Sequence, residues 1–182
     1  MLWENYTGGY KNVIQLLKRK AKRDVIHIPI KAKLIISVGE LSVRKNHSIV
    51  IEALNRINDK NIYYIIVGQG ALLNALLNKD QTGRLKLLGY RTDIVDLLHC
   101  ADLFAFPSLQ EGLPVALMEA MASGIPCLAS KIRGNIDLLE VIPSTLVEVN
   151  TDVGWKKAIV SSFKNDQQTV SELEGKVITG YS

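Results

Sequence analysis

Two carboxylates and two adjacent cations are the residues in this sequence best suited to bind a ligand. Glu111 and Glu119 lie in the segment at 107–124, PSLQEGLPVALMEAMASG, and Arg44 and Lys45 follow a glycine-ended apolar run. Cations beside the free backbone N–H groups at the start of a helix can form an anion-binding site. Neighbouring arginines and lysines are also common on protein surfaces, so a solvated pair is the alternative interpretation.

The spacing of the two glutamates disfavours paired acid–base catalysis. Glu119 follows Glu111 by eight positions, which is up to about 12 Å along a helix that rises ~1.5 Å per residue. Two carboxylates that act on one glycosidic bond lie roughly 5–10 Å apart. The pair could instead hold hydroxyl groups on two parts of one long ligand, such as the vicinal hydroxyls of a ribose. The alternative is a solvated Glu119 and a Glu111 that caps the helix or interacts with its dipole.

A third candidate is the segment GQG at 68–70, which follows one predicted strand and precedes a helix. The dinucleotide-binding fingerprint, GxGxxG, needs a third glycine and an acidic residue about twenty positions later. Leu73 occupies the third glycine position, and the nearest acid beyond Leu88 is Asp93. The weak match disfavours a dinucleotide-dependent oxidoreductase, and a tight strand-to-helix turn explains both glycines.

Apolar runs and helical patterns alternate through the chain, as expected of βαβ units. The runs are apolar throughout, so both of their faces should be buried, as in a parallel sheet covered by helices. The sequence therefore predicts an α/β fold: a Rossmann-like, doubly wound parallel sheet of about six strands with helices on both faces. The predicted strands are 33–38, 62–67, 85–88, 103–106, 126–129 and 146–149, and the predicted helices are 46–57, 71–77, 93–99, 113–123 and 152–163.

Ligands of such sheets bind at the carboxyl ends of the strands. The helix predicted at 113–123 should therefore point its start into the ligand crevice, with Glu111 directly before it. Pro114 suits the first turn of that helix. Apolar residues on one face of it should pack on the sheet; they are Leu113, Ala116, Leu117, Ala120 and Met121.

The length and composition fit one globular domain. The chain has 182 residues, of which 47% are hydrophobic and 22% charged, which excludes a disordered chain. No apolar run approaches the ~20 residues of a membrane-spanning helix. The first twenty residues lack the apolar core of a secretory signal, so a cytoplasmic location is expected. Cys100 and Cys127 lack metal-ligand spacing and are expected to be buried apolar side chains.

The net charge of +4 comes from one segment. Residues 1–33 hold eight of the lysines and arginines but only two acidic residues. A solvated helix face or a linker is the favoured interpretation, and contact with an anionic membrane surface is the alternative. Nucleic acid is not an expected partner, because Tyr10 is the one aromatic residue nearby. The predicted organisation is a basic N-terminal segment or interdomain linker at 1–32, a Rossmann-like domain at 33–165 and a polar C-terminal tail at 166–182.

Five segments together resemble the retaining glycosyltransferases of family 4. Glu111, seven intervening residues and Glu119 are similar to the E-x7-E signature of that family, and Gly39 with Arg44-Lys45-Asn46 is similar to its phosphate-binding loop. The resemblance continues, in order and spacing, through VGQG at 67–70, LGYRTDI at 88–94 and ADLFAFPS at 101–108, and it covers about residues 24–150.

The resemblance implies a GT-B fold, in which two Rossmann-like domains enclose the active site. This chain resembles the C-terminal domain, which holds the nucleotide-sugar donor, and the N-terminal acceptor domain would be missing. The implied reaction is retaining transfer of a hexosyl group, with a UDP-sugar as the expected donor and GDP-mannose as the alternative, to a polysaccharide or lipid-linked acceptor. The chain alone is expected to be inactive. A non-catalytic nucleotide-binding or interaction module with the same fold is the competing hypothesis.

The resemblance also implies a role for each matching residue. Lys45, aided by Arg44, would neutralise the donor diphosphate, Glu111 would contact hydroxyls of the transferred sugar, and Glu119 would bind the ribose; Lys45 and Glu111 are the predicted catalytic residues. The base would pack on Tyr90 or Arg91. The remaining predicted donor-binding residues are Gly39, Gly68, Gly70, Gly112, Leu113 and Pro114.

Two features bear on the electrostatics of the implied site. Many family members have an arginine directly after the first-loop glycine, where this chain has Glu40, so a two-cation clamp would need Arg44 as the second cation. There is no Asp-x-Asp motif of the kind that holds a divalent cation, so neither a metal nor another cofactor is expected. His47 is a further candidate for phosphate contact.

Overall fold

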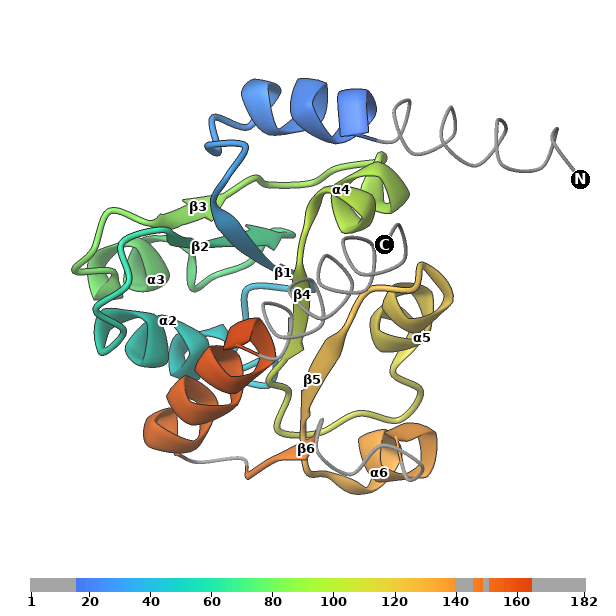
Figure 1. The fold of residues 1–182 in the computed structure, drawn as a ribbon. Coiled ribbons are helices and arrows are strands. Elements are labelled where there is room, and N and C mark those ends of the chain that lie inside the picture. Colours follow the sequence, from blue (N-terminus) through green and yellow to red (C-terminus); the bar gives the residue numbers. More distant parts are fainter. Residues whose placement is uncertain (1–15, 140–145, 149–150, 165–182) are drawn as a thin grey trace, which may run out of the picture.

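The computed structural model describes residues 16–139, 146–148 and 151–164. Its centre is a six-stranded, all-parallel sheet in the order β3-β2-β1-β4-β5-β6 (Figure 1). The strands are β1 (Lys33–Val38), β2 (Ile62–Val67), β3 (Leu85–Leu87), β4 (Leu103–Phe106), β5 (Cys127–Ser130) and β6 (Leu146–Val147). The labelled helices are α2 (His47–Asn55), α3 (Leu73–Lys79), α4 (Ile94–Cys100), α5 (Val115–Ala122) and α6 (Arg133–Leu139), and further helices cover 16–25 and 152–164.

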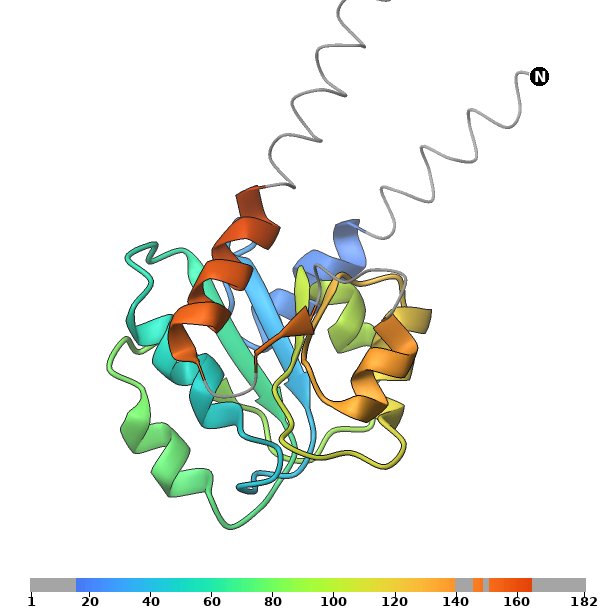
Figure 2. The same ribbon diagram turned by 90° about the horizontal axis from the view of Figure 1, so that it is seen from below.

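Helices cover both faces of this sheet, as the turned view shows (Figure 2). One face packs against α2, α3 and the helix at 152–164, whose Trp155 and Ile159 are fully buried. The other packs against α4, α5 and α6, together with Ile26 and Ile28, which follow the helix at 16–25. Alternate residues of β1 enter the two cores, Ile35 on the first face and Leu34 on the second. The predicted Rossmann-like, doubly wound α/β fold is therefore confirmed.

The start of α5 corrects a prediction. The helix begins at Val115 rather than Leu113, because Pro114 is in a non-helical conformation just before it. Leu113 therefore lies outside the apolar face that the spacing predicts, and its side chain is 68% exposed. Leu117 and Ala120 do pack in the core, but Met121 is largely at the surface. The helix α6, at Arg133–Leu139, was not among the predicted helices.

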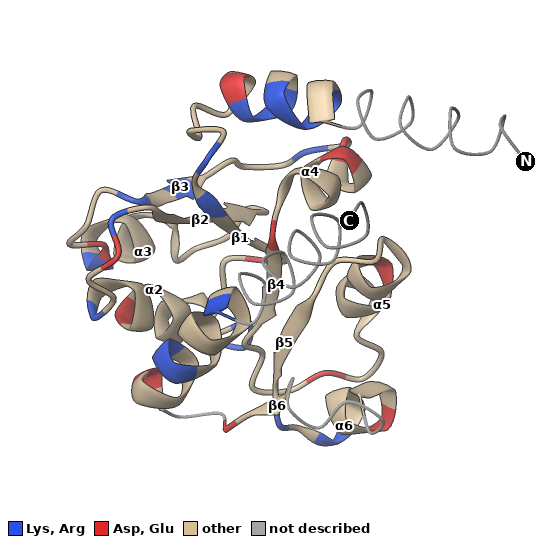
Figure 3. Ribbon diagram, in the orientation of Figure 1, with Lys and Arg blue, Asp and Glu red and all other residues tan. Residues whose placement is uncertain are grey.

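Figure 3 shows that the N-terminal helix at 16–25 is rich in basic residues, and three of their side chains bind acidic residues elsewhere in the domain. Arg19 and Arg23 both pair with Asp102, and Lys22 pairs with Asp93 at 2.6 Å. These three cations thus face partners within the chain, which leaves fewer of them for an anionic surface. Residues 1–15 and 166–182 of the predicted segments lie outside the described residues. Within the part of the chain that the structure covers, no helix is both long and apolar enough to span a bilayer.

Candidate functional site

The loops after β1 and β4 meet at the carboxyl edge of the sheet. These two strands are neighbours, Ile35 pairing with Leu103, but the chain leaves them toward opposite faces, into α2 and α5. Such a reversal opens a crevice outside the strand ends, which is where ligands of doubly wound sheets bind. The backbone N–H of Leu109 donates to the carbonyl of Arg44 at 2.8 Å and joins the two loops.

An ion pair spans this crevice. Lys45 Nζ lies 2.7 Å from Glu111 Oε1, and Arg44 approaches the same oxygen at 3.3 Å. The side chains of Lys45 and Glu111 are 13% and 6% exposed, whereas Arg44 is 47% exposed. The ammonium of Lys45 also lies 5.0 Å from the centre of the Phe106 ring, which adds a cation–π attraction. The structure therefore brings the two predicted catalytic residues together, with Arg44 at the rim.

The backbone around Lys45 explains how its side chain reaches the crevice. A Cβ on Gly39 would lie 3.2 Å from Lys45 Cε, so the glycine leaves room for the lysine stem. Asn46 is left-handed, with φ of 50°, a conformation that asparagine and glycine adopt more readily than other residues. This turn separates Lys45, in the crevice, from His47, which is buried. The prediction that His47 could touch phosphate is therefore wrong.

We expect Asn46→Gly to keep nucleotide affinity and stability close to those of the wild type, and Asn46→Val to lower both. A β-branched residue in the left-handed region costs about 1–2 kcal/mol, and relaxing the turn would move Lys45. Chemical denaturation and calorimetric titration with UDP measure the two effects. Asn61→Val, at an exposed position before β2, is the control. Equal behaviour of Asn46→Val and Asn46→Gly would contradict the role given to this turn.

The glycines Gly68 and Gly70 hold two loops together. A Cβ on Gly68 would lie 1.9 Å from the carbonyl oxygen of Gly39, and one on Gly70 would lie 2.5 Å from that of Leu41. The backbone N–H of Gly68 donates to the carbonyl of Gly89 at 2.9 Å. Their small size is thus needed for the close approach of the loops after β1 and β2, which explains them without a phosphate.

Tyr90 and Arg91, the two residues predicted to contact a base, differ in their availability. The guanidinium of Arg91 binds Asp93 through two hydrogen bonds, Nε to Oδ1 at 2.8 Å and NH2 to Oδ2 at 2.7 Å. That arginine and Lys22 hold the pKa of Asp93 well below its usual range. Tyr90 is 74% exposed. The guanidinium of Arg91 is thus engaged by Asp93, whereas the ring of Tyr90 is accessible for stacking.

The other predicted residues lie along the Glu111 loop and α5. Gly112 and Leu113 are exposed at the crevice, whereas Pro114 is buried. Glu119 lies on the exposed side of α5, and among the residues the structure describes no partner binds its carboxylate. It is thus free to accept hydrogen bonds from a ligand.

One residue that sequence reasoning did not select supports the Glu111 loop from α6. A Cβ on Gly134 would lie 3.3 Å from the carbonyl oxygen of Glu111 and 3.5 Å from that of Gly112. The helix α6 therefore packs directly on the loop that carries the carboxylate. The loop at 130–134 was expected at the carboxyl edge, but nothing in its sequence indicated that its glycine would touch Glu111.

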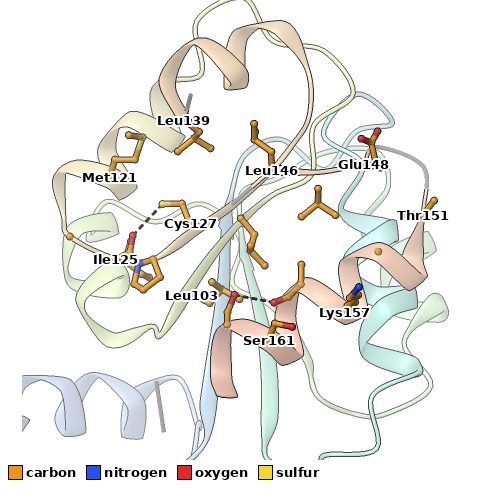
Figure 4. Close-up of a pocket in the computed structure, with 17 residues that line it drawn as sticks. Leu103, Met121, Ile125, Cys127, Leu139, Leu146, Glu148, Thr151, Lys157 and Ser161 are labelled. Carbon is orange, nitrogen blue, oxygen red and sulfur yellow. Dashed lines mark hydrogen bonds between the residues drawn. The ribbon is translucent and has the colours of Figure 1, made fainter. Parts of the chain in front are cut away.

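A cavity of about 930 Å³ is a separate feature (Figure 4). It opens between β5, β6 and the helix at 152–164, and its lining includes Leu103, Cys127 and Lys157. None of the predicted site residues contributes to it.

Both cysteines are buried and free, as predicted, and burial raises the pKa of the Cys127 thiol to about 12. No cluster of metal-binding side chains occurs within the described ranges.

Comparison with known proteins gives concordant matches. The family model described as "Glycosyl transferases group 1" matches residues 18–170. The UDP-Gal:alpha-D-GlcNAc-diphosphoundecaprenol alpha-1,3-galactosyltransferase of Escherichia coli is 35% identical over 91% of this chain and 46% of its own length. The amylovoran biosynthesis glycosyltransferase AmsK of Erwinia amylovora is 36% identical over 65% of this chain and 32% of its own. The chain thus spans less than half the length of these relatives.

Solved structures share the fold. Anabaena Alr3699/HepE, crystallised in complex with UDP and glucose, has a TM-score of 0.76 at 24% identity, over 84% of this chain and 44% of that one. WaaG, a glycosyltransferase involved in lipopolysaccharide biosynthesis, has a TM-score of 0.71 at 22% identity, over 81% and 42% of the two chains.

Proposed function

The chain belongs to the group 1 glycosyltransferases, and from that premise we propose that it is the donor-binding part of a retaining hexosyltransferase. The donor is a nucleoside diphosphate sugar, and the acceptor is a polysaccharide or a lipid-linked sugar. The observation that carries the proposal is the ion pair of Lys45 and Glu111, 2.7 Å apart in the crevice between β1 and β4. It supplies a cation for a diphosphate and a carboxylate for sugar hydroxyls at one place.

A uridine nucleotide is the donor we propose. The relative from Escherichia coli is named for UDP-Gal, and HepE was crystallised with UDP and with UDP-glucose. The exposed ring of Tyr90, on the loop after β3, offers a surface on which a pyrimidine can stack. The exposed carboxylate of Glu119, on the neighbouring α5, suits the two ribose hydroxyls.

The proposed chemistry assigns complementary charges to the two parts of the donor. When the bond between sugar and diphosphate breaks, negative charge grows on the leaving phosphate and positive charge on the sugar ring. Lys45, with Arg44 at the rim, stabilises the former, and Glu111 stabilises the latter through the sugar hydroxyls. In the proposed retaining mechanism the donor phosphate accepts the proton of the acceptor, so no side chain of this chain serves as general base.

The acceptor side of the site belongs, in this proposal, to a second domain. Large apolar side chains are exposed on the loops that follow β1, β3 and β4 and at the start of α5; they are Val43, Tyr90, Leu113 and Val115. Exposed apolar side chains near a ligand site fit a surface that meets another domain. We therefore expect the isolated chain to bind nucleotide without transferring sugar.

Lys45→Ala and Glu119→Ala are expected to weaken the binding of UDP. Loss of a charge-assisted hydrogen bond to phosphate or ribose costs about 1.5–3 kcal/mol, or roughly 10- to 100-fold in Kd. Calorimetric titration of the chain with UDP, GDP and ADP measures these changes and identifies the base. Lys60→Ala, an exposed lysine before β2, is the control.

The outcomes of this titration separate the candidate functions. If neither this chain nor the full-length protein binds UDP, GDP or ADP, the proposed function is refuted. If Lys45→Ala binds UDP as tightly as the wild type, the diphosphate does not bind at Lys45. Nucleotide binding by a full-length protein that transfers no sugar would instead fit a non-catalytic nucleotide-binding module.

A further inference from the structure

A short chain of buried polar groups lies in the core beneath the loop that carries Lys45. Ser37 Oγ, on β1, donates to the carbonyl of Ala105, on β4, at 2.5 Å. It also lies 2.8 Å from the hydroxyl of Tyr64, on β2. That hydroxyl lies 3.4 Å from Nδ1 of His47, the first residue of α2. The polar chain therefore crosses three adjacent strands and ends at the loop.

Both ends of this polar chain adjoin the proposed site. Ala105 precedes Phe106, whose ring faces the ammonium of Lys45. His47 follows Lys45 with only the left-handed Asn46 between them. The polar chain thus connects the neighbours of Lys45 on both sides of the crevice.

The imidazole of His47 is held in its neutral form. The ring is 3% exposed. Burial lowers the pKa of His47 to about 4, and the charge of Lys45 acts in the same direction. The backbone of Glu40 and Gly39 lies beside the ring and opposes this shift, although Nε2 makes no hydrogen bond within the described residues. His47 consequently lies between the hydroxyl of Tyr64 and the backbone at the start of the Gly39–Lys45 loop, without adding a charge to the site.

Burying these polar groups contributes little to the free energy of folding. Buried polar groups give little net stability even when paired, and they cost about 1–3 kcal/mol when a partner is lost. This core face is built mainly from apolar side chains, and another buried polar residue, Arg84, binds the backbone carbonyls of Leu54 and Ile57 away from the crevice. Departures from an apolar core are expected where a functional site must be held in one geometry. The polar chain lies next to the crevice, and this position fits that expectation.

We infer that Tyr64 and His47 are positioning residues that hold the Gly39–Asn46 loop, and with it the ammonium of Lys45, in the geometry that binds a diphosphate. Neither side chain reaches the crevice: the Tyr64 hydroxyl contacts the ring of His47, and that ring lies beside the backbone of Gly39 and Glu40. The functional meaning rests on the proposed donor site, whereas the mechanical role can be tested without any ligand.

Tyr64→Phe removes only the hydroxyl, and Tyr63→Phe is its matched control. Tyr63 lies on the same strand, one residue away, and packs on the opposite face of the sheet. Hydrogen exchange, measured by mass spectrometry on the ligand-free chain, reports on the backbone of 39–46. We expect this segment to exchange about tenfold faster in Tyr64→Phe, as for the loss of one net hydrogen bond, and to be unchanged in Tyr63→Phe. Peptides of α5 serve as an internal reference.

Calorimetric titration with UDP completes the test. We expect Tyr64→Phe to weaken UDP binding severalfold. Combining it with His47→Phe should weaken binding little further, because both substitutions interrupt the same chain of polar groups. Equal exchange of the loop in the two tyrosine variants would overturn the inference, as would faster exchange spread evenly over the domain, which marks general destabilisation. Failure of the wild type to bind UDP would refute the donor site, whereas the exchange data would still decide whether the loop is held by Tyr64.

Discussion

Glu111→Gln is expected to bind UDP more tightly than the wild type while the full-length protein loses about 100-fold or more of its transfer rate. Without a ligand, the Glu111 carboxylate binds Lys45 at 2.7 Å and Arg44 at 3.3 Å. A diphosphate must compete with that carboxylate for both cations. Removing its charge frees them, which should lower the Kd of UDP by about three- to fivefold, the size of a partly exposed ion pair.

The same substitution removes the charge that would stabilise the developing positive sugar. Ground-state binding of the nucleotide and the rate of transfer should therefore change in opposite directions. Titration with UDP and initial rates with a UDP-sugar measure the two quantities. Glu52→Gln, which loses an ion pair with Lys79 on the surface of α2, is the matched control and should alter neither. Weaker binding of UDP to Glu111→Gln would show that the carboxylate supports the loop instead of competing with the ligand.

Arg23→Met is expected to lower the free energy of unfolding by about 3–5 kcal/mol, the range for breaking a buried ionic cluster. The guanidinium of Arg23 is fully buried and binds Asp102 at 2.9 Å. It also donates to the carbonyls of Cys100, at 2.8 and 3.0 Å, and of Ala32, at 2.7 Å. Methionine fills similar space but removes these donors from the two carbonyls and leaves Asp102 with Arg19 as its one cation among the described residues. Asp102 in turn accepts from the backbone N–H of Leu34, so the loss would reach β1.

Urea denaturation of the chain measures this loss. Lys20→Met, on the exposed side of the same helix, is the control, and its effect should stay within about 0.5 kcal/mol, as for most surface substitutions. If the two variants unfold at the same urea concentration, Arg23 is not the residue that fastens the N-terminal helix. Nucleotide affinity should be preserved in Arg23→Met wherever the protein remains folded, because Arg23 lies outside the crevice.

The parts of the fold that could be predicted are those that local patterns determine. β1, β2 and β4 have the bounds that their apolar runs predict, since central strands are buried on both faces. The ends of β3 and β5 differ by one residue, because their limits depend on pairing with neighbours. The helix α6 was missed because it is short and contains Gly134, a poor helix former. Packing against the Glu111 loop stabilises it instead.

The sequence could select candidate residues for the site but not the contacts among them. Motif resemblance and the strand-end rule together selected Lys45 and Glu111, which lie 66 positions apart in the sequence. That one binds the other is a result of three-dimensional geometry. The roles of Arg23 and Tyr64 could not be foreseen for the same reason. Arg23 binds mostly backbone carbonyls, which leave no trace in residue types, and Tyr64 is an ordinary strand residue until its hydroxyl is placed.

The neighbouring placement of β1 and β4 also has a consequence for the order in which the chain assembles. Ser37 and Ala105, which join these strands, are 68 positions apart, whereas β1 pairs with β2 and β2 with β3 over much shorter separations. Closing long loops costs more entropy, so such contacts form late. During synthesis the segment with Lys45 leaves the ribosome well before Glu111. In the nascent domain Lys45 and Arg44 therefore lack Glu111 as their partner until the second half folds against the first.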